Sequence, residues 1–209
     1  MAPPAKTSRP RGRRQGEPVS RDAVLRAAKQ RFAVEGYEKT TLRAIANDAR
    51  VDPSMVLYLF GSKAALFRES LRLILDTGAL VAALADGDGD IGSRMVRTYL
   101  GIWEHPDTAA SMVAMLQSAT SNPDAHEAFR AFMQSYVLTA VSGALGGGEQ
   151  ARMRALLAAT NLVGTAILRY VMRVAPLADL PADDVVRLIA PSVTRYLTAP
   201  ADELGLTGL

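Results

Sequence analysis

The segment VDPSMVLYLFGSK, Val51 to Lys63, decides the fold of this chain. It is mostly apolar or aromatic, begins with Asp-Pro and stops at Gly-Ser-Lys. Asp52 is a typical helix N-cap, and Pro53 suits the first helical position, where its missing N–H needs no partner. Gly61 is the kind of residue that ends a helix. The segment is therefore predicted to be a short helix, too apolar for a loop and too short for an ordinary core helix.

Two further helices are predicted before this segment. The first begins at Ser20, places apolar residues on one face at a spacing of three and four, and ends at Gly36. The second runs over residues 42–49 and is opened by Thr41. Two short helices joined by a turn of three or four residues make a helix-turn-helix.

The helix over residues 53–60 is expected to be half buried. Val56 and Phe60 are one turn apart, so both can pack on Ile45 and on the first helix. An outward face of short and apolar groups suits the major groove of DNA, where Met can touch a thymine methyl. The residues left facing outward are Pro53, Ser54, Met55 and Tyr58.

Charge is unevenly placed along the 209 residues. Residues 1–63 hold 13 basic and 6 acidic residues, whereas residues 64–209 hold 11 basic and 15 acidic. This asymmetry indicates an N-terminal part that faces a polyanion. Residues 1–19 are rich in Pro, Arg and Gly and are predicted to be a disordered basic arm. Two interpretations of Arg13 and Arg14 in this arm have equal weight: they belong to a solvated tail, or they contact DNA phosphates.

The rest of the chain is also predicted to be helical, so the fold class is all-α. Breakers such as Asn122-Pro123 and the glycines at 146–148 separate the apolar patterns, and no strand-like alternation occurs. The predicted domains are residues 20–66, with three helices, and residues 67–209. The helices expected after Gly61 span residues 63–85, 91–104, 107–119, 124–145, 149–174 and 182–197, of which 149–174 is apolar nearly all round and should be central.

Several function classes are disfavoured by the composition. The chain has no cysteine and only two histidines, His105 and His126, which are not paired one turn apart on a helix. No metal site, cofactor or nucleophile elbow is therefore predicted, and an enzyme is not expected. The acidic run at 86–90 lacks the Gly and Glu of a calcium loop. No apolar run reaches the length of a membrane span, so a cytoplasmic protein is expected.

The run AVLRAAKQRFAVEGYEKTTLRAIANDARVDPSMVLYLFGSKAALF, residues 23–67, resembles the DNA-binding domain of the TetR/AcrR family of bacterial transcriptional repressors. Gly-Tyr at 36–37, Thr-Thr at 40–41, Ile-Ala at 45–46 and Lys63 fall at the family's spacing. The segments TAILRYVMRVAPLADL and APSVTRYL resemble the regulatory domain of some actinobacterial members. The family implies DNA contacts by Thr41, Arg43, Pro53, Ser54, Met55, Tyr58 and Lys63.

Two positions depart from the family pattern. Arg50 stands at a turn where the family usually has Gly, which implies either a strained turn or a slightly shifted one, and an added charge near the DNA. Leu57 stands where the family usually has Tyr, a residue expected to contact a phosphate. The neighbouring Tyr58 is the candidate to replace that contact.

The resemblance further implies a homodimer with an effector pocket in each regulatory domain. Two recognition helices related by a two-fold axis would read a palindromic DNA operator. The interface would involve the last two helices, with Ala158, Gly164, Leu168, Val185, Ile189 and Val193 as candidate contacts. The pocket candidates are Trp103, Met112, Met115, Phe129, Phe132, Met133, Tyr136, Asn161, Thr165 and Tyr170. Met and aromatic residues at helical spacing also fit a plain core, so both readings stay open.

The sequence supports a repressor released by a small apolar or amphipathic effector. An effector-independent regulator or activator on the same fold is the alternative, and a packed regulatory core would favour it. A helical module that binds a lipid or a protein partner is a third reading, and it predicts no sequence-selective affinity for DNA.

Overall fold

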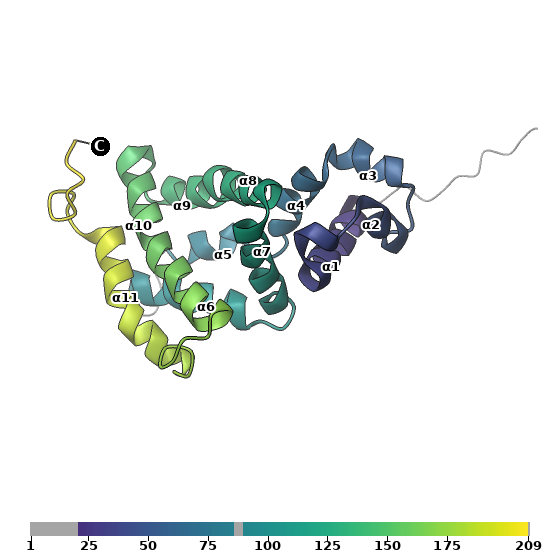
Figure 1. The fold of residues 1–209 in the computed structure, drawn as a ribbon. Helices are drawn as coiled ribbons and strands as arrows, with labels where there is room; N and C mark the ends of the chain where they lie inside the picture. Colours follow the sequence, from purple (N-terminus) through teal and green to yellow (C-terminus); the bar gives the residue numbers. More distant parts are fainter. Residues whose placement is uncertain (1–20, 86–89, 209) are drawn as a thin grey trace, which may run out of the picture.

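The polypeptide is helical throughout the part that the structure describes. The structure is a computed structural model that describes residues 21–85 and 90–208, and no strand occurs within these ranges. The all-α prediction is confirmed. A large helical bundle lies at one end of the molecule and the small group α1–α3 at the other (Figure 1). The helices are α1 (Arg21–Lys39), α2 (Leu42–Asp48), α3 (Pro53–Phe60), α4 (Lys63–Leu71), α5 (Thr77–Ala82), α6 (Ile91–Glu104), α7 (Ala109–Ser121), α8 (Pro123–Phe132), α9 (Leu138–Ala144), α10 (Gly148–Ala166) and α11 (Ala182–Thr198).

Some predictions fall on residues outside these ranges. They are the basic arm with Arg13 and Arg14, the helix start at Ser20 and the acidic run at 86–89.

Local capping explains the boundaries of α1–α3. Gly36 has φ of 74° and interrupts the helical path of α1 near its end, as predicted. The side chain of Thr41 accepts a hydrogen bond from the amide of Ala44 and begins α2. Asp52 likewise accepts from the amide of Ser54, with Pro53 in the first turn of α3. Each cap satisfies amides that a helix start leaves without a backbone partner.

The prediction of one helix from residue 63 to about 85 is wrong. The helix α4 ends at Leu71, tight turns follow, and α5 is a separate helix that begins after Asp76. The carboxylate of Asp76 accepts the amide of Gly78 at 2.8 Å. An Asp side chain that captures an amide two residues on competes with helix continuation, and this capture starts a new helix instead.

Two long helices of the regulatory bundle contain a turn of π-helix. Met133–Val137 joins α8 to α9, and Ile167–Val171 continues α10. The predicted continuous helix over residues 124–145 is therefore present, with a local widening. Short π segments of this kind often occur at functional sites.

One face of α10 is buried and the opposite face is exposed. The prediction that this helix is central is therefore wrong. Ala155, Ala158 and Leu162 lie in the core, whereas Leu156 and Leu168 are 42% and 41% exposed. The small buried residues Ala155 and Ala158 let α10 approach its neighbours closely.

Candidate DNA interface and effector cavity

The helix α3 divides into a buried and an exposed face. Val56 is fully buried and Phe60 is 8% exposed, so these two side chains anchor α3 to the core as predicted. Ser54 and Leu57 are exposed, and Tyr58 is 84% exposed. Pro53 and Met55 are half-buried. The exposed face therefore carries short, apolar and aromatic groups, with hydroxyls on Ser54 and Tyr58.

The start of α3 is held by Asp52. Its carboxylate accepts both the amide and the hydroxyl of Ser54, at 2.8 and 2.6 Å. These hydrogen bonds lower the pKa of Asp52 below its ordinary value. The Ser54 hydroxyl donates within the helix cap, which leaves its oxygen lone pairs to accept from a partner.

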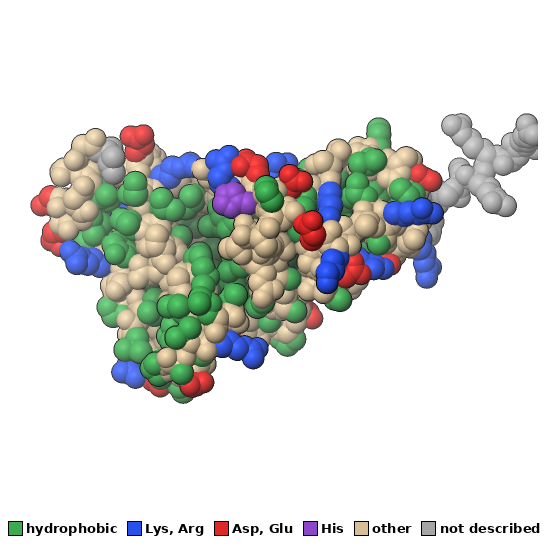
Figure 2. Space-filling view, in the orientation of Figure 1, with side chains coloured by type: hydrophobic (Ala, Val, Ile, Leu, Met, Phe, Trp, Pro, Cys, Tyr) green, Lys and Arg blue, Asp and Glu red, His purple; other side chains and the backbone are tan. Residues whose placement is uncertain are grey.

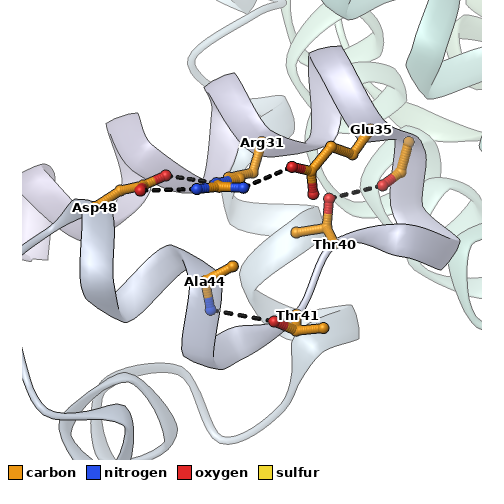
Figure 3. Close-up of polar contacts among 7 residues, drawn as sticks. Arg31, Glu35, Thr40, Thr41, Ala44 and Asp48 are labelled. Atoms are coloured by element: carbon orange, nitrogen blue, oxygen red, sulfur yellow. Dashed lines mark hydrogen bonds and ion pairs between the residues drawn. The ribbon is translucent and has the colours of Figure 1, made fainter.

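The helices α1 and α2 are joined by an ion network (Figure 3). The guanidinium of Arg31 donates to Asp48 through two nitrogens, at 2.5 and 2.9 Å, and to Glu35 at 2.5 Å. These hydrogen bonds, first that to Asp48, raise the pKa of Arg31. Nearby, Thr40 is buried and donates to the carbonyl of Gly36 at 2.7 Å. Sequence reasoning missed this network, although the spacing of Arg31 and Glu35 on one helix was a usable signal.

Positive charge available to a polyanion comes from exposed arginines. Arg43 and Arg50 are exposed, and within the described ranges neither has an ion-pair partner. Arg50 has φ of 56°, the left-handed region that favours glycine, in the turn between α2 and α3. Thr41 is exposed at the N-terminus of α2, where backbone amides favour an anion.

Lys63 lies at the start of α4 and makes its contacts within the chain. Its ammonium donates to the carbonyl of Glu38 at 3.2 Å and lies 4.4 Å from the centre of the Tyr37 ring. Burial lowers the pKa of Lys63. A phosphate contact by Lys63 would require the ammonium to leave or share this site.

The end of α1 also contacts the corner between α7 and α8. The Ser118 hydroxyl accepts a hydrogen bond from the amide of Tyr37 at 3.1 Å. The side-chain amide of Asn122 donates to the carboxylate of Glu38 and also caps α8. The end of α1 is thus held to α7 and to the start of α8 by polar contacts at one corner.

An internal cavity of about 60 Å³ lies among the helices of the larger bundle. Its wall is apolar apart from the Tyr99 hydroxyl and the Trp103 indole, and it contains no charged side chain. Burial raises the pKa of Tyr99 well above its usual range, so this group stays neutral. The indole N–H of Trp103 finds no acceptor of normal geometry in the described chain.

The structure brings about half of the predicted pocket residues together. Trp103, Met112, Met115, Phe129, Phe132 and Met133 line the cavity. Tyr136, Asn161, Thr165 and Tyr170 do not. The Tyr136 ring instead lies 4.7 Å from the guanidinium carbon of Arg72, and the Tyr170 hydroxyl donates to Glu104. Asn161 donates to the carbonyl of Leu157 on its own helix.

A surface groove of about 520 Å³ runs beside the cavity, between α10 and the segment formed by α8, its π turn and α9. Hydrophobic side chains gather in the hollow between α8 and α10, and basic side chains lie above it (Figure 2). The lining residues are His126, Phe129, Arg130, Met133, Gln134, Leu138, Arg152, Leu156, Ala159, Thr160 and Val163.

The predicted interface residues fall on both sides of α10 and α11. Gly164 and Ile189 are half-buried and Leu168 is exposed. Ala158, Val185 and Val193 are buried in the core of the subunit, which leaves little of their side chains for contact with a second chain. The outward apolar positions also include Leu188, which is 55% exposed and was not predicted. Val185 and Val193 are fully buried on α11, which packs against α6 and α10.

Two properties of the described residues bear on other function classes. None of the helices there is long and apolar enough to cross a membrane. Groups of three or more His, Asp or Glu that could hold a metal ion are absent from the same residues.

Comparison with known families agrees with this geometry. Residues 24–70 match the tetR family of bacterial regulatory proteins, and residues 89–197 match the tetracyclin repressor-like C-terminal domain. The chain belongs to the TetR family. It therefore has the fold of a DNA-binding transcriptional regulator and is not an enzyme. The helices α2 and α3 form the helix-turn-helix of this TetR-family protein.

Solved structures show the same architecture. A TetR-family regulator from Streptomyces coelicolor A3 is 35% identical, with a TM-score of 0.61 over 89% of this chain and 98% of that one. The multidrug binding protein EbrR, solved with imidazole, is 20% identical, with a TM-score of 0.60 over 87% and 91%. NalD of Pseudomonas aeruginosa, the secondary repressor of the MexAB-OprM multidrug efflux pump, is 19% identical, with a TM-score of 0.57 over 85% and 95%. The last two show the fold alone. No curated protein matches the chain.

Proposed function

We propose that this TetR-family protein is a homodimeric repressor that binds a palindromic operator and is released by a small apolar or amphipathic effector. The observation that carries the proposal is the position of the cavity relative to the corner between α7 and α8. Met112 and Met115 line the cavity from α7, and Ser118 on the same helix holds the amide of Tyr37. A ligand that displaces α7 would therefore also displace α1 and the helix-turn-helix.

The DNA contacts follow from exposure and charge. Ser54, Met55 and Tyr58, with Pro53, would face base edges and the backbone from α3. Thr41 and Arg43 would bind phosphates that set the register. Lys63 would contribute only by sharing its intramolecular site. Arg13 and Arg14 would add phosphate contacts from the N-terminal arm.

Operator binding is tested by fluorescence anisotropy of the protein on the DNA upstream of its own coding frame. A shuffled DNA of the same composition is the control, and both are measured over a salt series. Specific binding should exceed the control by roughly 10³-fold at physiological salt. Equal and steeply salt-dependent binding to both DNAs would indicate phosphate attraction alone and would refute operator recognition at this site.

Effector release is tested by linkage. If an effector releases the operator, the operator must weaken effector binding by the same factor. A titration that finds equal effector affinity with and without operator would contradict the mechanism.

The size of the cavity favours a second candidate, an effector-independent regulator on the same fold. A volume of about 60 Å³ is far below the roughly 300–1,000 Å³ of common ligand sites. The two candidates differ in one result, because only the effector-responsive protein loses operator affinity when a cavity-filling ligand is added.

A further inference from the structure

The groove and the cavity are adjacent and share part of their lining. Five residues line both: Phe129, Met133, Leu138, Ala159 and Val163. These side chains form the partition between the open groove and the enclosed space. A molecule lying in the groove therefore rests directly on the wall of the cavity.

The volumes indicate where a ligand would lie. The groove, at about 520 Å³, is within the size range of common ligand sites, whereas the cavity, at about 60 Å³, is not. An occupant would thus place most of its body in the groove. Only a narrow apolar end would pass between Phe129 and Met133 into the cavity.

The charged side chains that line the site are basic, and one of them is already paired with a carboxylate. No Asp or Glu lines the groove or the cavity. The guanidinium of Arg130 is bound to both carboxylate oxygens of Glu127, at 2.7 and 2.9 Å. Arg152 is exposed, lines the groove, and has no ion-pair or hydrogen-bond partner in the described chain. Arg152 is therefore the charge left free to receive an anion.

The floor of the groove continues from Arg152 along a single face of α10. Leu156, Ala159 and Val163 follow at helical spacing, so this floor extends over about 16 Å at 1.5 Å per residue. A guanidinium pairs best with a planar, two-oxygen acid such as a carboxylate. An apolar floor favours a hydrocarbon body.

We propose that the effector is an amphipathic carboxylic acid whose carboxylate pairs with Arg152. Its hydrocarbon body lies over Leu156 and Ala159, and its far end enters the cavity beside Met133. This inference rests on the proposed effector-responsive function and names the chemical class of the ligand.

The test uses three probes of equal chain length on the full-length protein: decanoic acid, methyl decanoate and decyltrimethylammonium. The chain has one tryptophan, Trp103, which lines the cavity, so its fluorescence reports binding. All probes are kept below their micelle concentrations. Decanoic acid should bind about ten-fold more tightly than the methyl ester, because a charge-assisted pair with a guanidinium is stronger than a neutral contact. The ammonium should bind most weakly.

Three variants identify the site. Arg152→Gln should abolish the preference for the acid and leave the affinity of the ester unchanged. Arg187 is an exposed arginine that pairs with Asp184 on α11, so Arg187→Gln is the matched control. It should change neither the preference for the acid nor the affinity of the ester. Ala159→Phe places a larger side chain between the groove and the cavity, so it should weaken the binding of all three probes. Circular dichroism should show that this variant is folded.

Several outcomes would overturn the proposal. They are equal affinity for the acid and the ester, a preference that survives Arg152→Gln, or tighter binding of the ammonium. A dimer that dissociates in Leu156→Glu would show that a second copy covers the groove, which also refutes it. Acid binding that leaves operator affinity unchanged would refute the effector mechanism but retain the ligand class. Operator release by the acid and the ester alike would retain the effector mechanism but refute the ligand class.

Discussion

Arg50 has a backbone conformation that costs free energy for any residue with a side chain. Its φ of 56° lies in the left-handed region, where Cβ meets the following carbonyl. The family resemblance left open a strained turn or a slightly shifted one, and the φ of Arg50 shows the strained conformation. The exposed guanidinium makes no compensating ion pair in the described residues. Arg50 therefore lowers the stability of the fold somewhat and places a positive charge beside the recognition helix α3.

Arg50→Gly should raise the free energy of unfolding by about 0.5–1 kcal/mol, because glycine adopts this conformation without steric cost. Urea denaturation at neutral pH measures the change. Arg50→Ala removes the same charge but keeps the strained φ, so it should show no such gain. Equal stabilisation by both substitutions would mean that charge, and not backbone strain, decides the effect.

Residue roles were predictable where the partner is close in sequence and unpredictable where it is remote. Thr41 and Asp52 cap helices three and two residues on, and local patterns predicted both. Lys63 reaches Glu38 and Tyr37 instead of remaining free, since a long side chain samples partners that no local pattern specifies. Asn161 was a pocket candidate that does not line the cavity, because the sequence alone does not say which face of a helix meets the cavity.

At the scale of elements, α6 and α11 approach each other closely at Gly92. A Cβ built on Gly92 would lie 2.4 Å from the carbonyl oxygen of Ala190 and 2.7 Å from the amide nitrogen of Thr194. Both are backbone atoms, so neither can rotate away. This glycine therefore fixes the distance between the two helices.

Gly92→Ala should destabilise the protein by about 1–3 kcal/mol or more, as expected for overpacking. Gly101 is the matched control in the same helix, with no atom within 4 Å of an added Cβ. Gly101→Ala should instead stabilise by about 0.5–1 kcal/mol through helix propensity. Thermal unfolding of the two variants should give melting temperatures on opposite sides of the parent, and a shift in the same direction would contradict the close contact.

The start of α6 predicts a dependence of stability on pH. The Asp90 carboxylate accepts from the hydroxyls of Ser93 and Thr194 and from the amide of Ser93, and these hydrogen bonds, first that from the Ser93 hydroxyl, lower its pKa. Because the folded pKa lies below the unfolded value of about 3.9, the stabilisation is present above pH 4 and is lost as pH falls below it.

Asp90→Asn retains a good N-cap but removes the charge, so it should destabilise by about 1 kcal/mol at pH 7. The difference from the parent should shrink progressively below pH 4. Urea midpoints at pH 7, 5, 4 and 3 measure this. An undiminished difference at pH 3 would show that the charge of Asp90 does not contribute.

Most helices were predicted at the level of elements, because caps, glycines and prolines are local signals. The break between α4 and α5 was missed because the apolar pattern continues across Asp76, whose side chain accepts the amide of Gly78 and begins α5. The central position predicted for α10 failed for a different reason. A helix with two apolar faces has both faces buried only when a neighbouring element covers each face. Within a single subunit, only one face of α10 is covered.

At the scale of the whole molecule, exposed apolar side chains gather on the outer faces of α10 and α11. Leu168, Met172 and Val174 follow the end of α10, and Leu188 lies on α11. Apolar residues grouped in this way mark interaction surfaces more often than isolated ones do. This face is where the proposed homodimer would form.

The double variant Leu168→Glu with Leu188→Glu should convert the dimer into a monomer, because two buried charges per subunit would lack partners. Light scattering coupled to size-exclusion chromatography measures the mass. Val34→Glu is the control, since Val34 is 85% exposed on α1 and far along the chain from this face. A dimer that persists in the double variant, or one that is lost in the control, would place the interface elsewhere.

The division of α3 has a consequence for how such regulators diversify. Folding depends on Val56 and Phe60, whereas Leu57 and Tyr58 point away from the core. Substitutions on the outer face leave the buried anchors intact, and surface changes of this kind usually alter stability by less than about 0.5 kcal/mol. After gene duplication, descendants of this protein can therefore acquire new DNA targets while natural selection on folding leaves those positions free to vary.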